Sequence, residues 1–230
     1  MSLKNSANPA PVKRRVYGRK SGRLSALQKT HLANDLPRYI FSRESAPLDF
    51  SQIFGKKYNA YALEIGFGAG EHLLLQAQTY PETGFLGAEP FLSGVAKATR
   101  GLTEKKISNV RIFQDDARIL LAALKEESLE HVYILFPDPW PKKRHHDRRI
   151  VSAEVIAEIL RVLKRNGHLH LASDHESYRQ WMDEVLAQFP KLKAIKNWSE
   201  NEPELWGETR YQAKAKRAGR LSKWSVWKKS

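Results

Sequence analysis

The chain has 230 residues, enough for one domain, and its 41% hydrophobic content excludes a wholly disordered protein. Cysteine is absent, which excludes disulfides and thiolate metal sites, and no apolar run approaches the roughly 20 residues that a membrane helix needs. The 39 basic residues outnumber the 25 acidic ones and give a net charge of +14, which suits a polyanionic partner such as nucleic acid. We therefore expect a cytoplasmic protein with no membrane segment and no bound metal.

The N-terminal segment is the first of three basic clusters. Residues 1–30 contain eight Lys and Arg residues and no acid, residues 207–230 contain eight with only Glu208, and residues 142–149 contain five. Such clustering fits a phosphate-binding surface. Residues 1–23 are rich in Pro, Ser and Asn without an apolar period, so we predict a flexible tail ahead of a single domain over residues 24–230. The tail either binds RNA or only aids solubility.

Strand and helix patterns alternate along the rest of the chain. A helix over residues 24–33 and a loop through Pro37 and Pro47 come first. The predicted strands are 60–65, 84–88, 110–113, 131–136, 168–172, 192–195 and 225–227. The predicted helices are 71–79, 91–100, 117–124, 152–164, closed by Asn166-Gly167, and 178–188. This alternation is typical of an α/β, Rossmann-like fold with a mostly parallel sheet, helices on both faces, and ligands at the C-terminal strand ends.

The first predicted strand ends in a glycine loop, Glu64-Ile65-Gly66-Phe67-Gly68-Ala69-Gly70. Three alternating glycines let the backbone turn sharply and approach a ligand, although a plain tight turn has the same pattern. The dinucleotide fingerprint requires its third glycine at the position of Glu71. Acids at Glu64 and Glu71 would repel a pyrophosphate but tolerate a cofactor with sulfonium and ammonium charges. The loop therefore favours S-adenosylmethionine.

Two further acids follow the next two predicted strands. Glu89 lies 23 residues after Gly66, where a carboxylate can accept hydrogen bonds from both ribose hydroxyls. Asp116 follows the third strand, where its carboxylate can bind an adenine amino group or cap the next helix. Because successive parallel strands end at one edge of a sheet, these acids predict a single cofactor pocket together with Glu64.

The fourth predicted strand runs into a rigid, basic loop, which reads Phe136-Pro137-Asp138-Pro139-Trp140-Pro141-Lys142-Lys143-Arg144-His145-His146-Asp147-Arg148-Arg149. Asp138 can accept hydrogen bonds from a base edge, and Trp140 can either stack on a base or pack beneath the loop. The five cations of the loop suit phosphates. His145 and His146 look like a metal pair, but no further ligand stands at a suitable spacing, which favours polar loop residues.

The loop over residues 136–149 closely resembles the FPDPWPKKRHxKRR motif of tRNA (guanine-N7)-methyltransferases, and residues 64–70 and 209–212 resemble two more motifs of that family. The resemblance implies a seven-stranded class I methyltransferase fold, S-adenosylmethionine as donor, and a guanosine at position 46 of the tRNA variable loop as acceptor. It implies cofactor contacts from Glu64, Gly66, Gly68, Gly70, Glu89, Asp116 and Asp138, with Asp138 also beside the reaction as the catalytic residue. It implies substrate contacts from Lys142, Asp174, Thr209, Arg210, Tyr211 and Gln212.

Two positions depart from the family pattern. The family usually has Glu at the position of Gln212, so a carboxylate contact to guanine would become an amide contact. Asp147 stands at a usually basic position, which removes a phosphate contact. Neither departure affects the predicted cofactor pocket.

Two other functions compete with the methyltransferase. A nicotinamide-dependent oxidoreductase would share the fold class, but Glu71 replaces its third glycine. A non-catalytic RNA-binding protein with a decayed methyltransferase domain would not need the cofactor-side acids and the Asp138 loop that this chain retains. The sequence indicates tRNA as the partner and no obligate protein partner.

Overall fold

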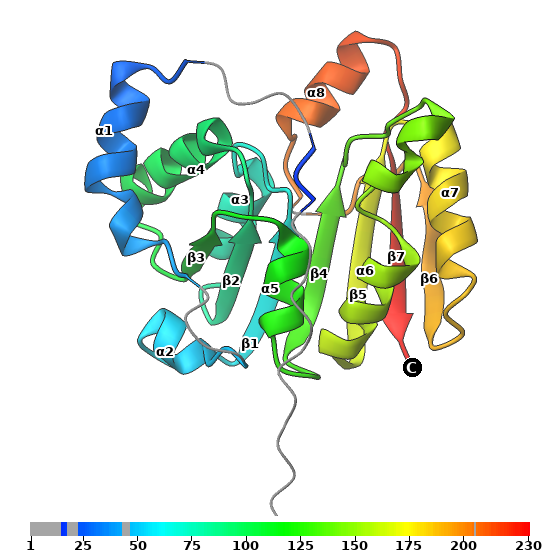
Figure 1. Ribbon diagram of the computed structural model, residues 1–230, viewed down its shortest axis with the longest axis horizontal. Helices are drawn as coiled ribbons and strands as arrows, with labels where there is room; N and C mark the ends of the chain where they lie inside the picture. Colours follow the sequence, from blue (N-terminus) through cyan, green and yellow to red (C-terminus); the bar gives the residue numbers. More distant parts are fainter. Residues whose placement is uncertain (1–14, 18–22, 43–46, 205) are drawn as a thin grey trace, which may run out of the picture.

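The computed structural model describes residues 15–17, 23–42, 47–204 and 206–230. Seven strands form one sheet in the order β3-β2-β1-β4-β5-β7-β6 (Figure 1). The strands are β1 (Ala60–Ile65), β2 (Thr83–Ala88), β3 (Val110–Phe113), β4 (Leu129–Leu135), β5 (Leu163–Ser173), β6 (Leu192–Ser199) and β7 (Lys223–Lys229). The first five pair in parallel, and β7 runs antiparallel to both β5 and β6. The predicted seven-stranded, mostly parallel sheet is confirmed.

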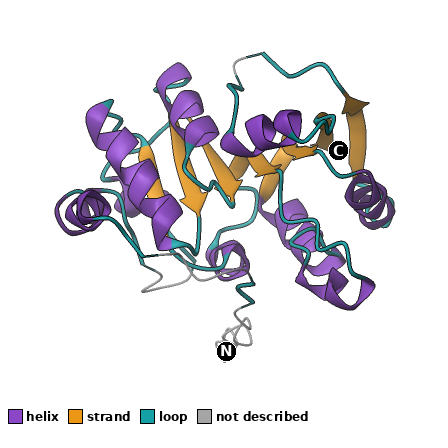
Figure 2. Ribbon diagram, turned by 90° about the horizontal axis from the view of Figure 1, so that it is seen from above, coloured by secondary structure: helices purple, strands orange, loops and turns teal. Residues whose placement is uncertain are grey.

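Helices cover both faces of the sheet (Figure 2). They are α1 (Ala26–Asn34), α2 (Phe50–Phe54), α3 (Glu71–Thr79), α4 (Leu92–Glu104), α5 (Ala117–Ala123), α6 (Ala153–Val162), α7 (Glu176–Leu186) and α8 (Arg210–Arg217), with 3-10 turns η1 (Leu36–Arg38) and η2 (Lys143–Arg148). Helices α1, α3 and α4 contact one another on one side, and α5, α6 and α7 do so on the other. Within the described ranges, every helix is too short or too polar to cross a membrane.

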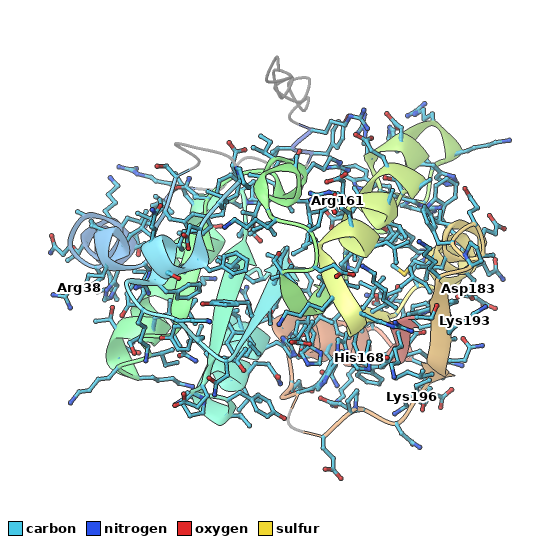
Figure 3. The ribbon with its side chains drawn as sticks, turned by 90° about the horizontal axis from the view of Figure 1, so that it is seen from below. Arg38, Arg161, His168, Asp183, Lys193 and Lys196 are labelled. Carbon is cyan, nitrogen blue, oxygen red and sulfur yellow. The ribbon has the colours of Figure 1, made fainter. Side chains whose placement is uncertain are left out.

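The period of two along the strands divides the core between these two helix layers. In β1, Leu63 and Ile65 belong to the cluster that includes Leu120 of α5 and Ile156 of α6. Ala62 belongs instead to the cluster on the α3 and α4 side. Because both faces of the sheet are buried, its central strands are largely apolar, as is typical of parallel strands, although Glu64 of β1 and His170 of β5 are polar exceptions. The sheet makes the molecule long, with Arg38 of η1 and Lys193 of β6 at opposite ends (Figure 3).

Several predicted boundaries differ from the structure: α4 runs to Glu104 and β6 to Ser199, beyond the predicted ends at residues 100 and 195. The largest error lies between α6 and β5. The helix expected to run to residue 164 and close at Asn166-Gly167 ends at Val162, and β5 begins at Leu163. Asn166 has a φ of +67° inside the strand, and the pairing with β4 shifts between Leu129 and His131. The Asn-Gly pair therefore makes a bulge in a strand, because the same left-handed backbone serves a bulge or a helix end.

The structure also contains elements that the apolar pattern did not predict, namely η1, α2, η2 and α8. Residues 1–14 and 18–22, most of the predicted tail, lie outside the described residues. The single-domain organisation and the flexibility of the tail stay predictions.

Candidate active site

A cavity of about 860 Å³, open to solvent, lies at the C-terminal ends of the parallel strands. This is where α/β folds bind ligands. The predicted site residues that line it are Gly66, Glu89, Asp116, Asp138 and Tyr211. The topology thus brings together residues from the ends of β1, β2, β3 and β4 and from α8.

The glycine loop forms the floor beside β1. Gly66, Gly68 and Gly70 all have left-handed backbones, with φ of +74°, +59° and +84°, a conformation that disfavours other residues. A Cβ at Gly94 of α4 would collide with the Gly68 carbonyl oxygen, so the loop and α4 pack backbone to backbone. Gly68 and Gly70 lie behind the cavity wall and shape it without lining it.

Glu64 also lies behind the wall. It is 4% exposed, and its Oε2 is 2.8 Å from Nδ1 of the equally buried His72 on α3. The His72 ring packs against Tyr133 and Trp206, with centroid distances of 4.8 and 5.0 Å. Glu64 acts on the cavity through its charge, which helps to raise the pKa of Glu89.

Glu89 is held by the backbone on both sides of its carboxylate. Its Oε2 accepts from the Gly68 N–H at 3.0 Å and its Oε1 from the Phe91 N–H at 2.9 Å. Burial raises the pKa of Glu89 to about 7, against the lowering effect of the two N–H donors and with a further rise from the charges of Asp138 and Glu64. The carboxylate is therefore fixed in place but poorly solvated, which suits a group that awaits hydrogen-bond donors.

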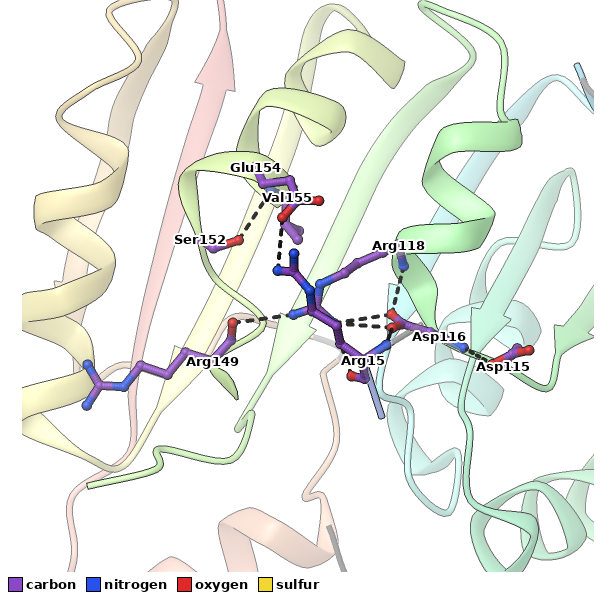
Figure 4. A network of polar contacts seen from close by, with 8 residues as sticks. All are labelled: Arg15, Asp115, Asp116, Arg118, Arg149, Ser152, Glu154 and Val155. Atoms are coloured by element: carbon purple, nitrogen blue, oxygen red, sulfur yellow. Dashed lines mark hydrogen bonds and ion pairs between the residues drawn. The ribbon is translucent and has the colours of Figure 1, made fainter. Parts of the chain in front are cut away.

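Asp116 caps α5 and also faces the cavity. Its Oδ1 accepts from the Arg118 N–H at 3.0 Å, and its Oδ2 accepts from the Arg15 N–H at 2.6 Å. The guanidinium of Arg118, itself 6% exposed, lies 3.2 Å from Oδ1 (Figure 4). Helix capping, one of the two roles considered for Asp116, is thus present, and the carboxylate remains on the cavity wall.

Asp138 and Trp140 stand on the loop after β4. Partial burial raises the pKa of Asp138, while the charge of Lys214 on α8 lowers it. The Trp140 ring lines the cavity, with Arg148 5.0 Å from its centroid and the Tyr17 ring edge-on at 6.4 Å. Trp140 is therefore packed by loop and N-terminal residues and still reaches the cavity.

The predicted substrate residues divide between α8 and its surroundings. Thr209 caps α8 by accepting from the Gln212 N–H at 3.1 Å. Gln212 is 2% exposed, and its amide donates to Glu202 at 2.7 Å. Tyr211 covers the glycine loop, where a Cβ at Gly68 would meet its ring at 3.2 Å.

The other predicted substrate residues lie at the surface around the cavity. Arg210 and Lys142 are exposed. Asp174 pairs with Arg220 at 2.7 Å. None of these three side chains lines the cavity.

The basic loop does not present all five cations to solvent. Lys142, Lys143 and Arg144 are exposed, as is Asp147, and Arg148 is half-buried. Arg149 is only 2% exposed, so its predicted phosphate contact is wrong. Its guanidinium lies between rings of α7, because the chain turns inward there to start the segment before α6.

Sequence reasoning missed several cavity-lining residues, among them Arg15, Tyr17 and Arg118. Arg15 and Tyr17 come from the segment predicted as a tail, and Arg118 comes from α5. The position of Arg118 two residues after Asp116 was the only available signal, and it does not separate a buried arginine from a solvated one. Among the described residues, no three His, Cys, Asp or Glu side chains gather closely enough to hold a metal ion.

Solved structures with this fold include methyltransferases. The 16S rRNA methyltransferase KamB superposes with a TM-score of 0.60 at 17% identity, over 84% of this chain and 99% of that one. A SAM-dependent methyltransferase from Aquifex aeolicus gives a TM-score of 0.54 at 12% identity, over 78% and 87% of the two chains. At such low identity these likenesses show the fold alone.

Sequence relatives are much closer. Residues 58–226 match the family model "Putative methyltransferase". A tRNA (guanine-N(7)-)-methyltransferase of Hyphomonas neptunium is 40% identical, over 87% of this chain and 93% of the relative. The enzyme of that name from Agrobacterium fabrum is 39% identical over 90% and 91%, and that of Rhodospirillum rubrum 36% identical over 94% and 88%. With this similarity along most of both chains, and with the predicted acids at the ends of successive strands, the chain belongs to the family of tRNA (guanine-N7)-methyltransferases.

Proposed function

We propose that this protein transfers a methyl group from S-adenosylmethionine to N7 of a guanosine in tRNA, at position 46 of the variable loop. The observation that carries the proposal is the convergence of Glu89, Asp116 and Asp138 on one cavity in a chain of this family. Three exposed cations, Lys142, Lys143 and Arg144, follow the cavity-lining Trp140 in the chain and supply the charge that an RNA substrate needs.

We expect this cavity to bind the methyl donor. The glycine loop contributes Gly66 to the cavity wall, where its left-handed backbone presents no side chain. Glu89 keeps lone pairs free beyond its two N–H contacts, so it can accept from the ribose hydroxyls. We expect Asp116, which lines the same cavity, to accept from the adenine amino group. Arg15, Arg118 and Arg148 line the cavity together with Glu89, Asp116 and Asp138, and Arg118 pairs with Asp116. Glu89 and Asp138, with Glu64 behind the wall, are therefore the acids that favour a ligand with positive charge.

Little proton transfer is required of the protein. S-adenosylmethionine supplies an electrophilic methyl group when bound. Guanine N7 carries a lone pair and no proton, so the chain need not provide a strong general base. Its residues have to hold N7 in line with that methyl group and support the positive charge that the purine ring gains. Asp138 is suited to both tasks because it stands at the cavity wall on a loop stiffened by proline.

The proposal is tested with an unmodified tRNA transcript and a donor carrying a radiolabelled methyl group. We expect label in the tRNA, and we expect chain cleavage at one variable-loop guanosine after borohydride and aniline treatment, which attacks N7-methylguanosine. A transcript with adenosine at that position is the control. Label that persists in the control transcript, or label without cleavage, would contradict N7 transfer at that site.

A further inference from the structure

Arg149 is buried where the sequence predicts a phosphate contact. It is 2% exposed, and its Nε donates to the Pro139 carbonyl at 2.9 Å. Its guanidinium lies 4.9 Å from the ring centroids of both Tyr178 and Trp181 on α7. Trp181 in turn donates to the Val151 carbonyl at 2.8 Å. The side chain therefore reaches back to the loop that carries Asp138 from a pocket of aromatic rings.

The arrangement is costly for a cation. Burial lowers the pKa of Arg149, and no carboxylate in the described part of the chain forms an ion pair with it. An apolar side chain could fill the gap between the rings without this desolvation penalty. What an apolar residue could not supply is the hydrogen bond to Pro139, which lies between Asp138 and Trp140. The guanidinium of Arg149 thus makes a contact with the Pro139 peptide that an apolar side chain at this position would lose.

The backbone of Arg149 makes a second connection on the opposite side. Its carbonyl lies 3.5 Å from Nη2 of Arg118, while its guanidinium points away from Arg118 (Figure 4). Nη1 of Arg118 lies 3.2 Å from Oδ1 of Asp116. A continuous chain of polar contacts therefore joins Asp116, on the wall proposed for adenine, to Pro139 in the loop.

We propose that Arg149 is a positioning residue, not a phosphate ligand: its guanidinium holds the Pro139 peptide and its backbone links that loop through Arg118 to Asp116. The inference rests on the proposed methyl transfer, because its purpose is to set Asp138 and Trp140 at a fixed distance from the donor. A loop displaced by about 1 Å loses roughly a hundredfold in rate when geometry carries catalysis.

The test compares Arg149→Met with Arg161→Met. Methionine keeps length and an apolar body between the rings but removes the donor. Arg161, labelled in Figure 3, also donates to two backbone carbonyls, those of Leu124 and Leu121, at 2.9 and 2.8 Å, and it lies outside the cavity wall. Arg161 also pairs with Glu158 at 2.7 Å, so Arg161→Met removes carbonyl contacts and an ion pair without touching the loop. Arg149→Lys keeps the cation and serves if the methionine variant does not fold.

Three measurements are made on the full-length variants: kcat at saturating donor and tRNA, the salt dependence of tRNA binding, and amide hydrogen exchange over residues 138–148. We expect Arg149→Met to lose about tenfold to a hundredfold in kcat, to keep the parent's salt slope, and to exchange faster in the loop. Arg149→Lys should have a kcat and a loop exchange rate between those of Arg149→Met and the parent. Arg161→Met should leave all three near the parent's values.

A salt slope flattened by about 0.7 to 0.9, the loss of one phosphate contact, would overturn the inference. So would a folded Arg149→Met with the parent's kcat and loop exchange. If the parent transfers no methyl group to tRNA, the proposed function fails. Amide hydrogen exchange over residues 138–148 then decides by itself whether Arg149 holds the loop.

Discussion

Replacing Glu89 with Ala should weaken binding of S-adenosylmethionine more than the loss of a surface acid. The carboxylate is 5% exposed and is fixed by the N–H groups of Gly68 and Phe91. Its side chain therefore loses little further conformational entropy when the donor binds. A hydrogen bond to a charged group contributes about 1–3 kcal/mol, which corresponds to roughly a 5- to 150-fold rise in Kd. Calorimetric titration of the RNA-free protein measures it. Glu104→Ala, an exposed acid on α4, is the control.

The raised pKa of Glu89 makes the effect dependent on pH. With a pKa of about 7 in the free protein, Glu89 becomes protonated as the pH falls through neutrality and loses part of its capacity to accept. The Kd of the donor should therefore rise as the pH falls below about 7, by up to about tenfold per pH unit. Glu89→Ala should remove most of this dependence, whereas Glu104→Ala should keep it.

The stability of the free protein should change with pH in the direction opposite to donor affinity: it should fall as the pH rises toward 7. The folded pKa of Glu89, about 7, lies above the ordinary 4.5, so between these values the folded state holds a proton that the unfolded chain has released. The contribution of Glu89 to stability is thus full below about pH 4.5 and is lost as the pH rises to about 7, by about 3 kcal/mol in total. Both effects rest on the raised pKa of Glu89. A donor affinity that does not change between about pH 6 and 8 in the parent, or that changes equally in Glu89→Ala, would refute it.

Three further changes test other parts of the site. Asp138→Ala should reduce methyl transfer severely with little change in Tm, since the residue stands on a loop outside the core; near-normal turnover at saturating substrates would remove it from the active site. Lys142→Ala with Lys143→Ala should weaken tRNA binding and flatten its log–log salt slope by about one to two units, while donor affinity stays constant, as filter binding at several salt concentrations would show. Gly94→Ala should push the Gly68 backbone out of place and weaken donor binding, with a destabilisation of about 1–3 kcal/mol in thermal unfolding; an alanine variant with the parent's donor Kd would mean that the loop tolerates the displacement.

The cofactor side of the site could be predicted from the sequence because topology places it. In a parallel sheet, the C-terminal ends of β1, β2 and β3 meet at one edge, so acids that follow those strands must converge. Glu89 and Asp116 do line one cavity. Glu64 shows the limit of this rule. It is the second-last residue of β1, and its side chain contacts His72 behind the cavity wall instead of lining the cavity.

The exposure of the individual cations in the basic loop could not be predicted in this way. Arg148 and Arg149 are adjacent and chemically identical, yet one is half-buried beside the cavity and the other lies between rings of α7. That difference is set by Tyr178 and Trp181, which lie 29 and 32 residues after Arg149 in the chain. Local charge patterns predict what a loop can bind, but only tertiary packing decides which cations remain at the surface.

Position 212 is where the departure from the family pattern meets the structure. Gln212 stands where the family usually has Glu, but its amide donates to the Glu202 carboxylate at 2.7 Å, so a carboxylate from the loop before α8 lies beside it. Gln212→Glu alone would bring two carboxylates together with one of them buried, and we expect a loss of tRNA methylation and of stability. Glu202→Gln alone would remove the carboxylate. The double variant restores one amide and one carboxylate, so its kcat/KM for tRNA should exceed that of either single variant. Additive losses in this cycle would show that the two side chains act separately, and an unaffected Glu202→Gln would show that recognition of tRNA does not use the carboxylate.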